Sequence, residues 1–319
     1  MGTYILRRLL WTVFLLFVIT ALVFFIFDVL PTADPAALRA GRNATPESIA
    51  AIRAQLNLDD PLVVRFGRYV SDLIFSFDFG TSVVNDAPVW DQIREAIPNT
   101  IMLVLGAAVV WFVAGVAVGM ISAVRRGSFL DRASMTLALV AISAPVYWLG
   151  LVALYLFSSD LGVIGIFPPA GTYDAANGIF RNIDSLFLPW LVLAAAFSAV
   201  YARLLRSNLL ETMSEDYIRT ARAKGLSERR VIFRHGLRSA ITPIITVLGL
   251  DIGILLGGAI LTESVFGIPG IGRLAFDAIQ RNDIAIVQGA TLFLALGVCL
   301  MSLLVDILYA FLDPRVKYQ

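Results

Sequence analysis

Six long apolar stretches constrain the fold of this chain more than any other feature of its sequence. They occupy residues 5–30, 100–124, 135–157, 187–205, 241–261 and 289–311. A helix needs about 20 mostly apolar residues to cross the hydrocarbon core of a bilayer. The sequence therefore predicts an all-α polytopic membrane protein with six transmembrane helices and a long extracytoplasmic segment after the first of them.

The composition agrees with this fold and argues against several kinds of function. Of the 319 residues, 58% are hydrophobic and 15% are charged, whereas a soluble globular domain carries about 25% charged residues. The net charge of +1 gives no general attraction to nucleic acid. Because Cys299 and His235 are the only cysteine and histidine, we assign no disulfide, no metal ligand and no catalytic residue.

The positions of lysine and arginine predict the orientation in the membrane. Most of the 25 basic residues lie near the two termini, between the second and third stretches, or between the fourth and fifth. Cytoplasmic loops carry an excess of these residues, so we expect both termini and residues 214–238 in the cytoplasm. The apolar run after Arg7 and Arg8 exceeds the 7–15 residues or so of a signal-peptide core, which predicts an uncleaved helix.

Three regions follow from this topology. Residues 1–30 form the first transmembrane helix, residues 31–98 the extracytoplasmic segment, and residues 99–319 a five-helix transmembrane core that contains the cytoplasmic loop 207–238. Within the extracytoplasmic segment, a threonine, a proline and a glutamate at residues 45–47 are typical of a helix start. We expect that helix to run to about residue 56.

The arginine-rich segment at residues 214–238 has the features of two short helices joined by a corner. Glu215 and Asp216 would stand in the first turn of the first helix, where the helix dipole favours acids. Gly225 suits the left-handed position that follows a helix, and Ser227 suits the N-cap of the second. Leu226 would then project from the corner as an exposed apolar side chain.

A partner protein would explain the composition of the first short helix. Positive-inside topology alone accounts for its basic residues, Arg219, Arg222 and Lys224. It does not account for two small residues, Ala221 and Ala223, followed by a helix-ending glycine. These small side chains would let a soluble partner approach closely, so we predict that the corner seats in a groove of another protein.

Residues 217–226 (YIRTARAKGL) resemble the EAA loop of permeases of binding-protein-dependent ABC importers. The closest resemblance is to the first, B-type, permease subunit of the dipeptide/oligopeptide/nickel subfamily. Other matching segments are RRLL at 7–10, FGTS at 79–82, ESVFGIPGIG at 263–272, DILY at 306–309 and DPR at 313–315. Residues 219–221 replace the general Glu-Ala-Ala, as is usual in the peptide subfamily, while Gly236 and Ser239 stand where that subfamily more often has alanine and proline.

The resemblance implies the type I ABC importer permease fold and transport by alternating access. The chain would pair with a homologous second permease, and its coupling loop, residues 207–238, would dock on one of two ATP-binding subunits. Those subunits would bind ATP and Mg²⁺, because this chain has no GxxxxGK[ST] phosphate loop, and the chain itself would bind no cofactor. An extracytoplasmic solute-binding protein would deliver the solute at the bacterial cytoplasmic (inner) membrane.

The residues expected to couple to the ATPase all lie at the corner of the coupling loop. They are Glu215, Asp216, Tyr217, Arg219, Ala221, Ala223, Lys224, Gly225, Leu226 and Ser227.

A translocation pathway is expected along the fifth apolar stretch. An aspartate at a helix centre costs about 2.5–3.5 kcal/mol on insertion scales, so Asp251 either faces the pathway or is a paired structural acid. Gly249, Gly253 and Gly257 would allow close helix contact, either with the partner permease across the pore or within this chain. Gly115 and Gly119 repeat this spacing, and we expect them to pack within the chain.

The loop after the fifth stretch is rich in glycine and is expected to form a structured turn. Its residues Phe266, Gly267, Pro269 and Gly270 would contact the solute-binding protein or cap the pore. The extracytoplasmic segment is a second place for such contact.

Other functions remain possible from the residues alone. A membrane enzyme would need a recognisable site, and neither HExxH nor GxSxG occurs. A membrane scaffold would not need the capped corner. Among solutes, dipeptides and oligopeptides are favoured over nickel or another small solute, because one histidine, one cysteine and six methionines offer few soft metal ligands.

Overall fold

The computed structural model describes residues 2–30, 36, 45–55, 57–160, 162–256 and 259–312. These residues are mostly helical, and the β-structure among them is limited to the isolated bridges Thr81–Pro88 and Ser158–Phe167. The predicted all-α class is confirmed. Residues 257 and 313–315, which carry one predicted pathway glycine and one family motif, lie outside the described residues.

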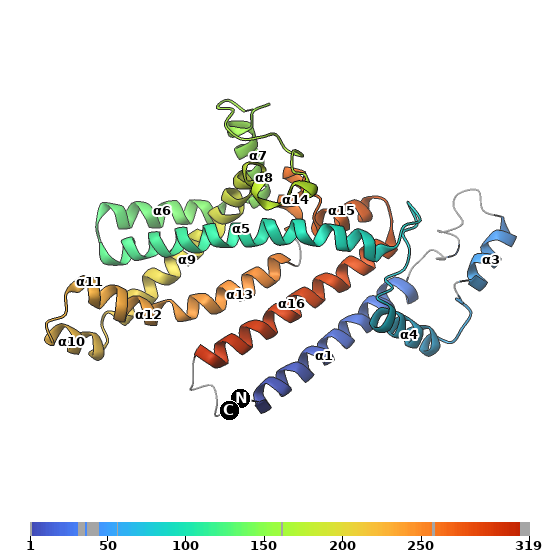
Figure 1. Cartoon of the computed structure of the whole chain (residues 1–319), viewed down its shortest axis with the longest axis horizontal. Helices are drawn as coiled ribbons and strands as arrows, with labels where there is room; N and C mark the ends of the chain where they lie inside the picture. The colour runs from blue at the N-terminus through green and yellow to red at the C-terminus, as the bar shows by residue number, and fades with distance from the viewer. Residues whose placement is uncertain are drawn as a thin grey trace.

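Three groups of helices follow one another along the chain (Figure 1). The first comprises α1 (Gly2–Phe24), η1 (Phe25–Val29), α3 (Pro46–Gln55), α4 (Leu62–Ser71) and η2 (Asp72–Ser76). The second comprises α5 (Val89–Val124), α6 (Phe129–Ser143), α7 (Val146–Phe157), η3 (Ala175–Asn177), α8 (Gly178–Arg181) and α9 (Ile183–Thr212). The third comprises α10 (Asp216–Ala223), α11 (Glu228–Arg230), η4 (Val231–Gly236), α12 (Leu237–Ala240), α13 (Thr242–Leu256), α14 (Ile260–Phe266), α15 (Ile271–Gln280) and α16 (Ile284–Leu312).

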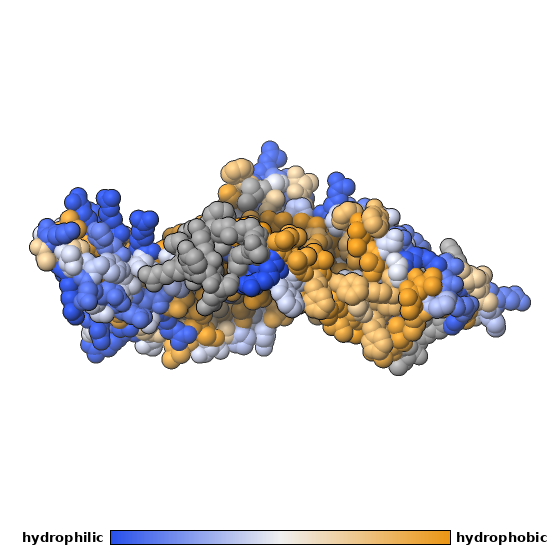
Figure 2. Space-filling view, turned by 90° about the horizontal axis from the view of Figure 1, so that it is seen from below, coloured by the Kyte–Doolittle hydropathy of each residue, from blue (hydrophilic) through white to orange (hydrophobic). Residues whose placement is uncertain are grey.

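Up to six membrane spans can be recognised in the described chain. Four are continuous helices of sufficient length and hydropathy, at Ile5–Val29, Val89–Val124, Ile183–Thr212 and Ile284–Ile307. Two more are bent pairs, which join Phe129–Ser143 to Val146–Phe157 and Glu228–Ala240 to Thr242–Leu256. Figure 2 shows apolar side chains gathered over α1 and α4. Contact of this surface with lipid is more favourable than contact with water.

The prediction of a single helix over residues 135–157 is wrong. α6 and α7 meet at 104°, because Pro145 lacks an N–H and disfavours helical backbone at the preceding residue. Ala144 is accordingly extended, with φ −87° and ψ 130°. Figure 1 shows α6 beside α5, with α7 turned away from both.

The core of the molecule is the long contact between α5 and α9. Trp111 of α5 is fully buried and stacks on Phe197 of α9 with ring centroids 4.8 Å apart. A Cβ atom at Gly115 would lie 2.5 Å from the Cβ of Tyr201, and one at Gly119 would lie 2.6 Å from a backbone oxygen of α9. These two glycines therefore pack within the chain, as predicted, and let the two helices approach closely.

The first and last spans lie side by side and antiparallel. Arg8 of α1 forms a 3.1 Å ion pair with Asp306 of α16 at one end. At the other end, Gln288 of α16 donates a 3.0 Å hydrogen bond to Asp28 of η1. The start of α1 and the distal part of α16 consequently lie at the same end of the molecule (Figure 1). Asp306, the first residue of the DILY segment, thus joins the first span to the last.

The helix predicted after residue 45 is confirmed as α3, Pro46–Gln55. Its first turn is capped by Thr45, whose hydroxyl oxygen accepts a 3.3 Å hydrogen bond from the backbone N–H of Ser48.

The glycines of α13 make the seam between α13 and α16. A Cβ atom at Gly249 would lie 2.0 Å from the side chain of Val305, and one at Gly253 would lie 2.8 Å from the Cβ of Met301. Of the two interpretations of this glycine face, packing within the chain is therefore the one found for these two residues.

We expect Gly253→Ala to destabilise the chain by about 1–3 kcal/mol, the usual cost of overpacking. The Cβ of Met301 is fixed to the backbone of α16, so it cannot move aside without separating the helices. Thermal unfolding in detergent measures the effect. Gly297→Ala in α16 is the matched control, because a Cβ there meets nothing within 4 Å; it should leave stability unchanged or raise it by up to about 1 kcal/mol. Equal effects at both positions would contradict this packing argument.

Candidate functional site: the coupling loop

The corner predicted after α10 is present and is held by two backbone hydrogen bonds. Gly225 has φ +76°, the left-handed conformation that glycine adopts without strain. Its N–H donates to the carbonyl of Arg222 at 2.9 Å, and the N–H of Leu226 donates to the carbonyl of Ala221 at 3.4 Å. This pair of bonds is a Schellman motif. The predicted helix end at Gly225 is confirmed.

The inner face of α10 packs on its own chain. Ile218, Ala221 and Val231 of η4 form a small buried cluster, against which Met213 and Leu226 pack. The expectation that Leu226 projects outward is therefore wrong. In a Schellman motif the residue after the glycine turns back to contact the last turn of the helix, and this contact half-buries Leu226. Ala221, expected to face a partner, is likewise only 7% exposed and faces this cluster.

The outer face of α10 is open. Tyr217 is 45% exposed, and Ala223 and Lys224 are exposed as well. Arg219 is also exposed and pairs with Asp216 within the helix at 3.3 Å. Figure 2 shows hydrophilic side chains concentrated at the end of the molecule that carries α10 to α12.

Ser227 occupies the N-cap position of α11, as predicted, but its side chain makes no capping hydrogen bond. Asp216 lies in the first turn of α10, as expected, whereas Glu215 precedes that turn as the N-cap residue, also without a side-chain hydrogen bond. Instead, Arg222 reaches across the corner and donates a 2.6 Å hydrogen bond to Glu228. This ion pair spans the corner between the two helices, and the residue spacing alone did not reveal it.

The coupling loop is fastened to the transmembrane helices at two places. Asn208 of α9 donates a 3.3 Å hydrogen bond to the backbone oxygen of Ala240 in α12. Gly236 of η4 lies so close to α9 that a Cβ there would be 2.9 Å from the sulfur of Met213. The glycine at 236, where the subfamily more often has alanine, therefore permits close packing of η4 on α9.

A partly buried ion pair braces the helices next to the loop. Arg206 of α9 donates two hydrogen bonds, of 2.7 and 2.9 Å, to the carboxylate of Asp131 in α6. Asp131 also accepts from the hydroxyl of Ser122 and, at 2.8 Å, from the N–H of Gly127. This network joins α5, α6 and α9. In the sequence, Arg206 is one of the basic residues between the fourth and fifth stretches that indicate topology, and no local feature marks Asp131 as its partner.

Asp251, predicted either to face the pathway or to be paired, has a partner within the chain. The hydroxyl of Tyr201 in α9 donates a 2.7 Å hydrogen bond to its carboxylate. Asp251 is nevertheless partly exposed. Its carboxylate therefore accepts a hydrogen bond within the chain and can still be reached from the surface of the chain. Gly253 is buried against α16.

A buried carboxylate holds together the turn between α14 and α15. Glu263 is fully buried. It accepts a 2.7 Å hydrogen bond from the hydroxyl of Thr100 in α5 and a 2.9 Å bond from the N–H of Arg273 in α15. Thr100 in turn accepts a 2.9 Å bond from the N–H of Ile271. Burial raises the pKa of Glu263. The carboxylate thus connects α5, α14 and α15.

The residues expected to meet the solute-binding protein differ in exposure. Phe266 and Gly270 are buried within this chain, Gly267 is half-buried with φ +70°, and Pro269 is exposed. The predicted turn is present, but only residues 267–270 belong to it, because Phe266 ends α14 and Ile271 begins α15. Pro269 is therefore the one of these four that offers its side chain freely.

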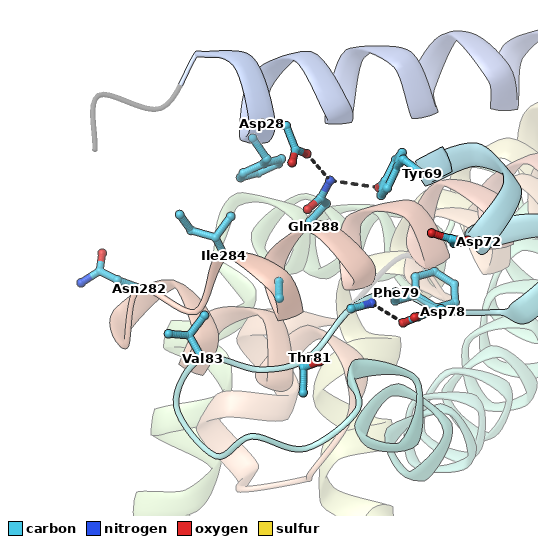
Figure 3. A pocket seen from close by; sticks show the side chains of 13 residues that line it. Asp28, Tyr69, Asp72, Asp78, Phe79, Thr81, Val83, Asn282, Ile284 and Gln288 are labelled. Carbon is cyan, nitrogen blue, oxygen red and sulfur yellow. Dashed lines mark hydrogen bonds between the residues drawn. The ribbon is translucent and has the colours of Figure 1, made fainter. Parts of the chain in front are cut away.

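The segment that follows the first span also folds onto the membrane-spanning helices. Its α4 and η2 form, with η1 and the start of α16, the wall of a cavity of about 280 Å³. Figure 3 shows Gln288 placed between Asp28 and Tyr69, to each of which its amide donates a 3.0 Å hydrogen bond. Burial, together with the nearby Asp28, raises the pKa of Tyr69, so this hydroxyl stays protonated at neutral pH.

Known proteins match this chain along its full length. The family described as binding-protein-dependent transport system inner membrane component matches residues 115–318, and the N-terminal part of such membrane components matches residues 1–104. The glutathione transport system permease protein GsiC of Salmonella paratyphi A is 41% identical over 320 residues, and that of Escherichia coli K12 is 40% identical over 319 residues. Both alignments cover the whole of both chains. This chain is thus a member of the family of inner-membrane permeases of binding-protein-dependent ABC importers, a transport subunit rather than an enzyme.

Proposed function

We propose that this chain carries short peptides or peptide-like solutes across the bacterial inner membrane. It would form half of the translocation pathway, with a homologous second permease as the other half. The relatives described as glutathione permeases support this solute class, because glutathione is a small peptide-like molecule and the identity extends over whole chains. An extracytoplasmic solute-binding protein would deliver the solute, and two ATP-binding subunits would hold ATP and Mg²⁺.

The structure of the coupling loop is the observation that best supports a role as a transport subunit driven by a separate ATPase. The inner face of α10 is fixed by its own cluster and by the Schellman corner, while Tyr217, Ala223 and Lys224 remain exposed. A short helix of this kind needs no partner to form, yet it offers a rigid outer face to one. The concentration of basic residues near both termini and in residues 214–238 supports an orientation with both termini in the cytoplasm.

The same contacts provide a route by which movement of α10 would reach the membrane. The buried cluster links α10 to η4, which continues into α12 and α13. α13 carries Asp251 and packs on α16. When the ATP-binding subunits close, displacement of α10 would tilt α13 against α9 and α16 and switch the pathway between inward-open and outward-open forms.

Ala223→Glu tests the docking of α10. The new carboxylate would lie on the exposed outer face, so we expect membrane insertion to persist while co-purification of the ATP-binding subunits falls at least tenfold, about 1.4 kcal/mol. Ala175→Glu, in the exposed η3, is a control for the same change of size and charge. Retention of the ATP-binding subunits by the Ala223→Glu variant would contradict the proposed docking surface.

Asp251→Asn tests the proposed pathway. Asparagine can still accept the hydrogen bond from Tyr201, but it removes the negative charge. If the charge meets a peptide amino group, uptake should fall several-fold while the ATP-binding subunits still assemble. Tyr201→Phe is the complementary variant, since it keeps the charge and removes only the hydrogen bond of 2.7 Å. Unchanged kinetics of peptide uptake in Asp251→Asn would make the residue purely structural.

Competition for uptake in reconstituted vesicles tests the solute class. Labelled glutathione should be displaced by unlabelled short peptides and not by Ni²⁺. Displacement by Ni²⁺ alone would favour the nickel alternative.

A further inference from the structure

A basic cavity lies where the coupling loop meets the membrane-spanning part of the chain. Its volume is about 560 Å³. Arg234, His235 and Arg238 supply its basic wall, and Ile241 and Ile245 supply its apolar floor. Tyr217 lines it from α10, so the cavity connects the coupling helix with the start of α13.

Among the described residues, the two arginines of this cavity have no acidic partner. In the adjoining structure, Arg206, Arg219 and Arg222 each form an ion pair with a carboxylate. In the part of the chain that the structure describes, no carboxylate lies within 4.0 Å of Arg234 or Arg238. The cavity therefore concentrates positive charge that the described residues do not neutralise.

The position of the cavity points to the bilayer as the source of an anion. It lies at the 46° bend between Glu228–Ala240 and Thr242–Leu256, a pair apolar enough together to span a membrane. Charged residues thus give way to apolar ones across the cavity itself.

We propose that this cavity binds the phosphate headgroup of an anionic phospholipid. Guanidinium groups match phosphate oxygens with paired hydrogen bonds, and basic pockets between membrane helices on the cytoplasmic side suit anionic headgroups. The apolar floor formed by Ile241 and Ile245 would contact the glycerol and acyl part of the lipid, which an acidic protein segment or free phosphate does not possess. A lipid bound here would touch both α10 and α13, so bilayer composition would affect the coupling loop directly.

Titration of phosphatidylglycerol into the full-length permease, purified in neutral detergent and followed by native mass spectrometry, tests this site. The wild-type chain should bind phosphatidylglycerol more tightly than phosphatidylcholine. In the double variant Arg234→Gln/Arg238→Gln we expect binding roughly thirty-fold weaker, since each basic residue near a membrane surface contributes about 1 kcal/mol. Arg229→Gln/Arg230→Gln in α11 removes the same charge outside the cavity and should bind as the wild type does.

Three results would overturn the proposal. These are unchanged binding in the double variant, an equal loss in the control variant, or displacement of the lipid by inorganic phosphate at equal concentration. The third would indicate a site for free phosphate. The binding assay contains no ATP and no ATP-binding subunit, so its failure is distinguishable from failure of the proposed coupling.

Discussion

Uptake should be lost in Gly225→Val while the variant still inserts into the membrane. The left-handed conformation at φ +76° costs an ordinary residue roughly 1–2 kcal/mol, and more if the residue is β-branched. α10 has only eight residues, and a helix so short depends on its ends and its packing rather than on its own stability. Loss of the corner would therefore rearrange the outer face of α10. We expect solute-stimulated ATP hydrolysis and uptake to fall at least tenfold.

Gly225→Asn separates the shape of the corner from the bulk of the side chain. Asparagine tolerates the left-handed region far better than valine, and a Cβ at residue 225 meets nothing within 4 Å. The asparagine variant should therefore keep most of its activity. Equal inactivity of both variants would show that any side chain blocks docking, and full activity of both would show that the corner is not used.

Glu263→Ala should be the most destabilising single change at the turn between α14 and α15. It removes the acceptor of two hydrogen bonds, leaving the hydroxyl of Thr100 and the N–H of Arg273 buried without it. Each unsatisfied buried group costs about 1–3 kcal/mol, and the vacated volume adds to this. We expect a loss on the order of 3 kcal/mol or more, measured by thermal unfolding in detergent.

Glu95→Ala is the matched control for this prediction. Glu95 lies in the same helix as Thr100 but is exposed, so its removal should change stability by no more than about 0.5 kcal/mol. Glu263→Gln keeps one acceptor oxygen and should lie between the two alanine variants. A Glu263→Ala variant as stable as Glu95→Ala would show that the buried carboxylate does not hold α5, α14 and α15 together.

Local rules predicted the features of this chain that depend on neighbouring residues. Hydropathy located the membrane spans, and helix-capping rules located the start of α3 and the end of α10 at Gly225. The spacing of Gly115 and Gly119 indicated the close approach of α5. Each of these features is determined within a few residues of sequence, which is the distance over which such rules hold.

Two expectations were wrong although local sequence rules predict the structure that is observed. Averaged hydropathy does not register a single Pro145, although proline predicts the bend between α6 and α7. Leu226 was expected to be exposed because it follows a corner, whereas the Schellman motif turns that residue inward.

The remaining features depend on pairs that are distant in sequence. Thr100 and Glu263 are 163 residues apart, and Arg206 and Asp131 are 75 apart. A single sequence holds no local signal for such pairs, because each member looks like an ordinary polar residue beside an apolar stretch. The basic cavity at Arg234 and Arg238 was not predicted for a different reason, because positive-inside topology alone explains its arginines.

Cross-linking from Ala223 is the most direct test of how the chain is driven. The variant Ala223→Cys is made in a Cys299→Ser background, which leaves one thiol in the chain. We predict that this thiol resists a membrane-impermeant maleimide added to intact cells and that it cross-links to an ATP-binding subunit in isolated membranes. Labelling from outside the cell, or the absence of any cross-link to that subunit, would contradict the docking of α10 on a cytoplasmic ATPase.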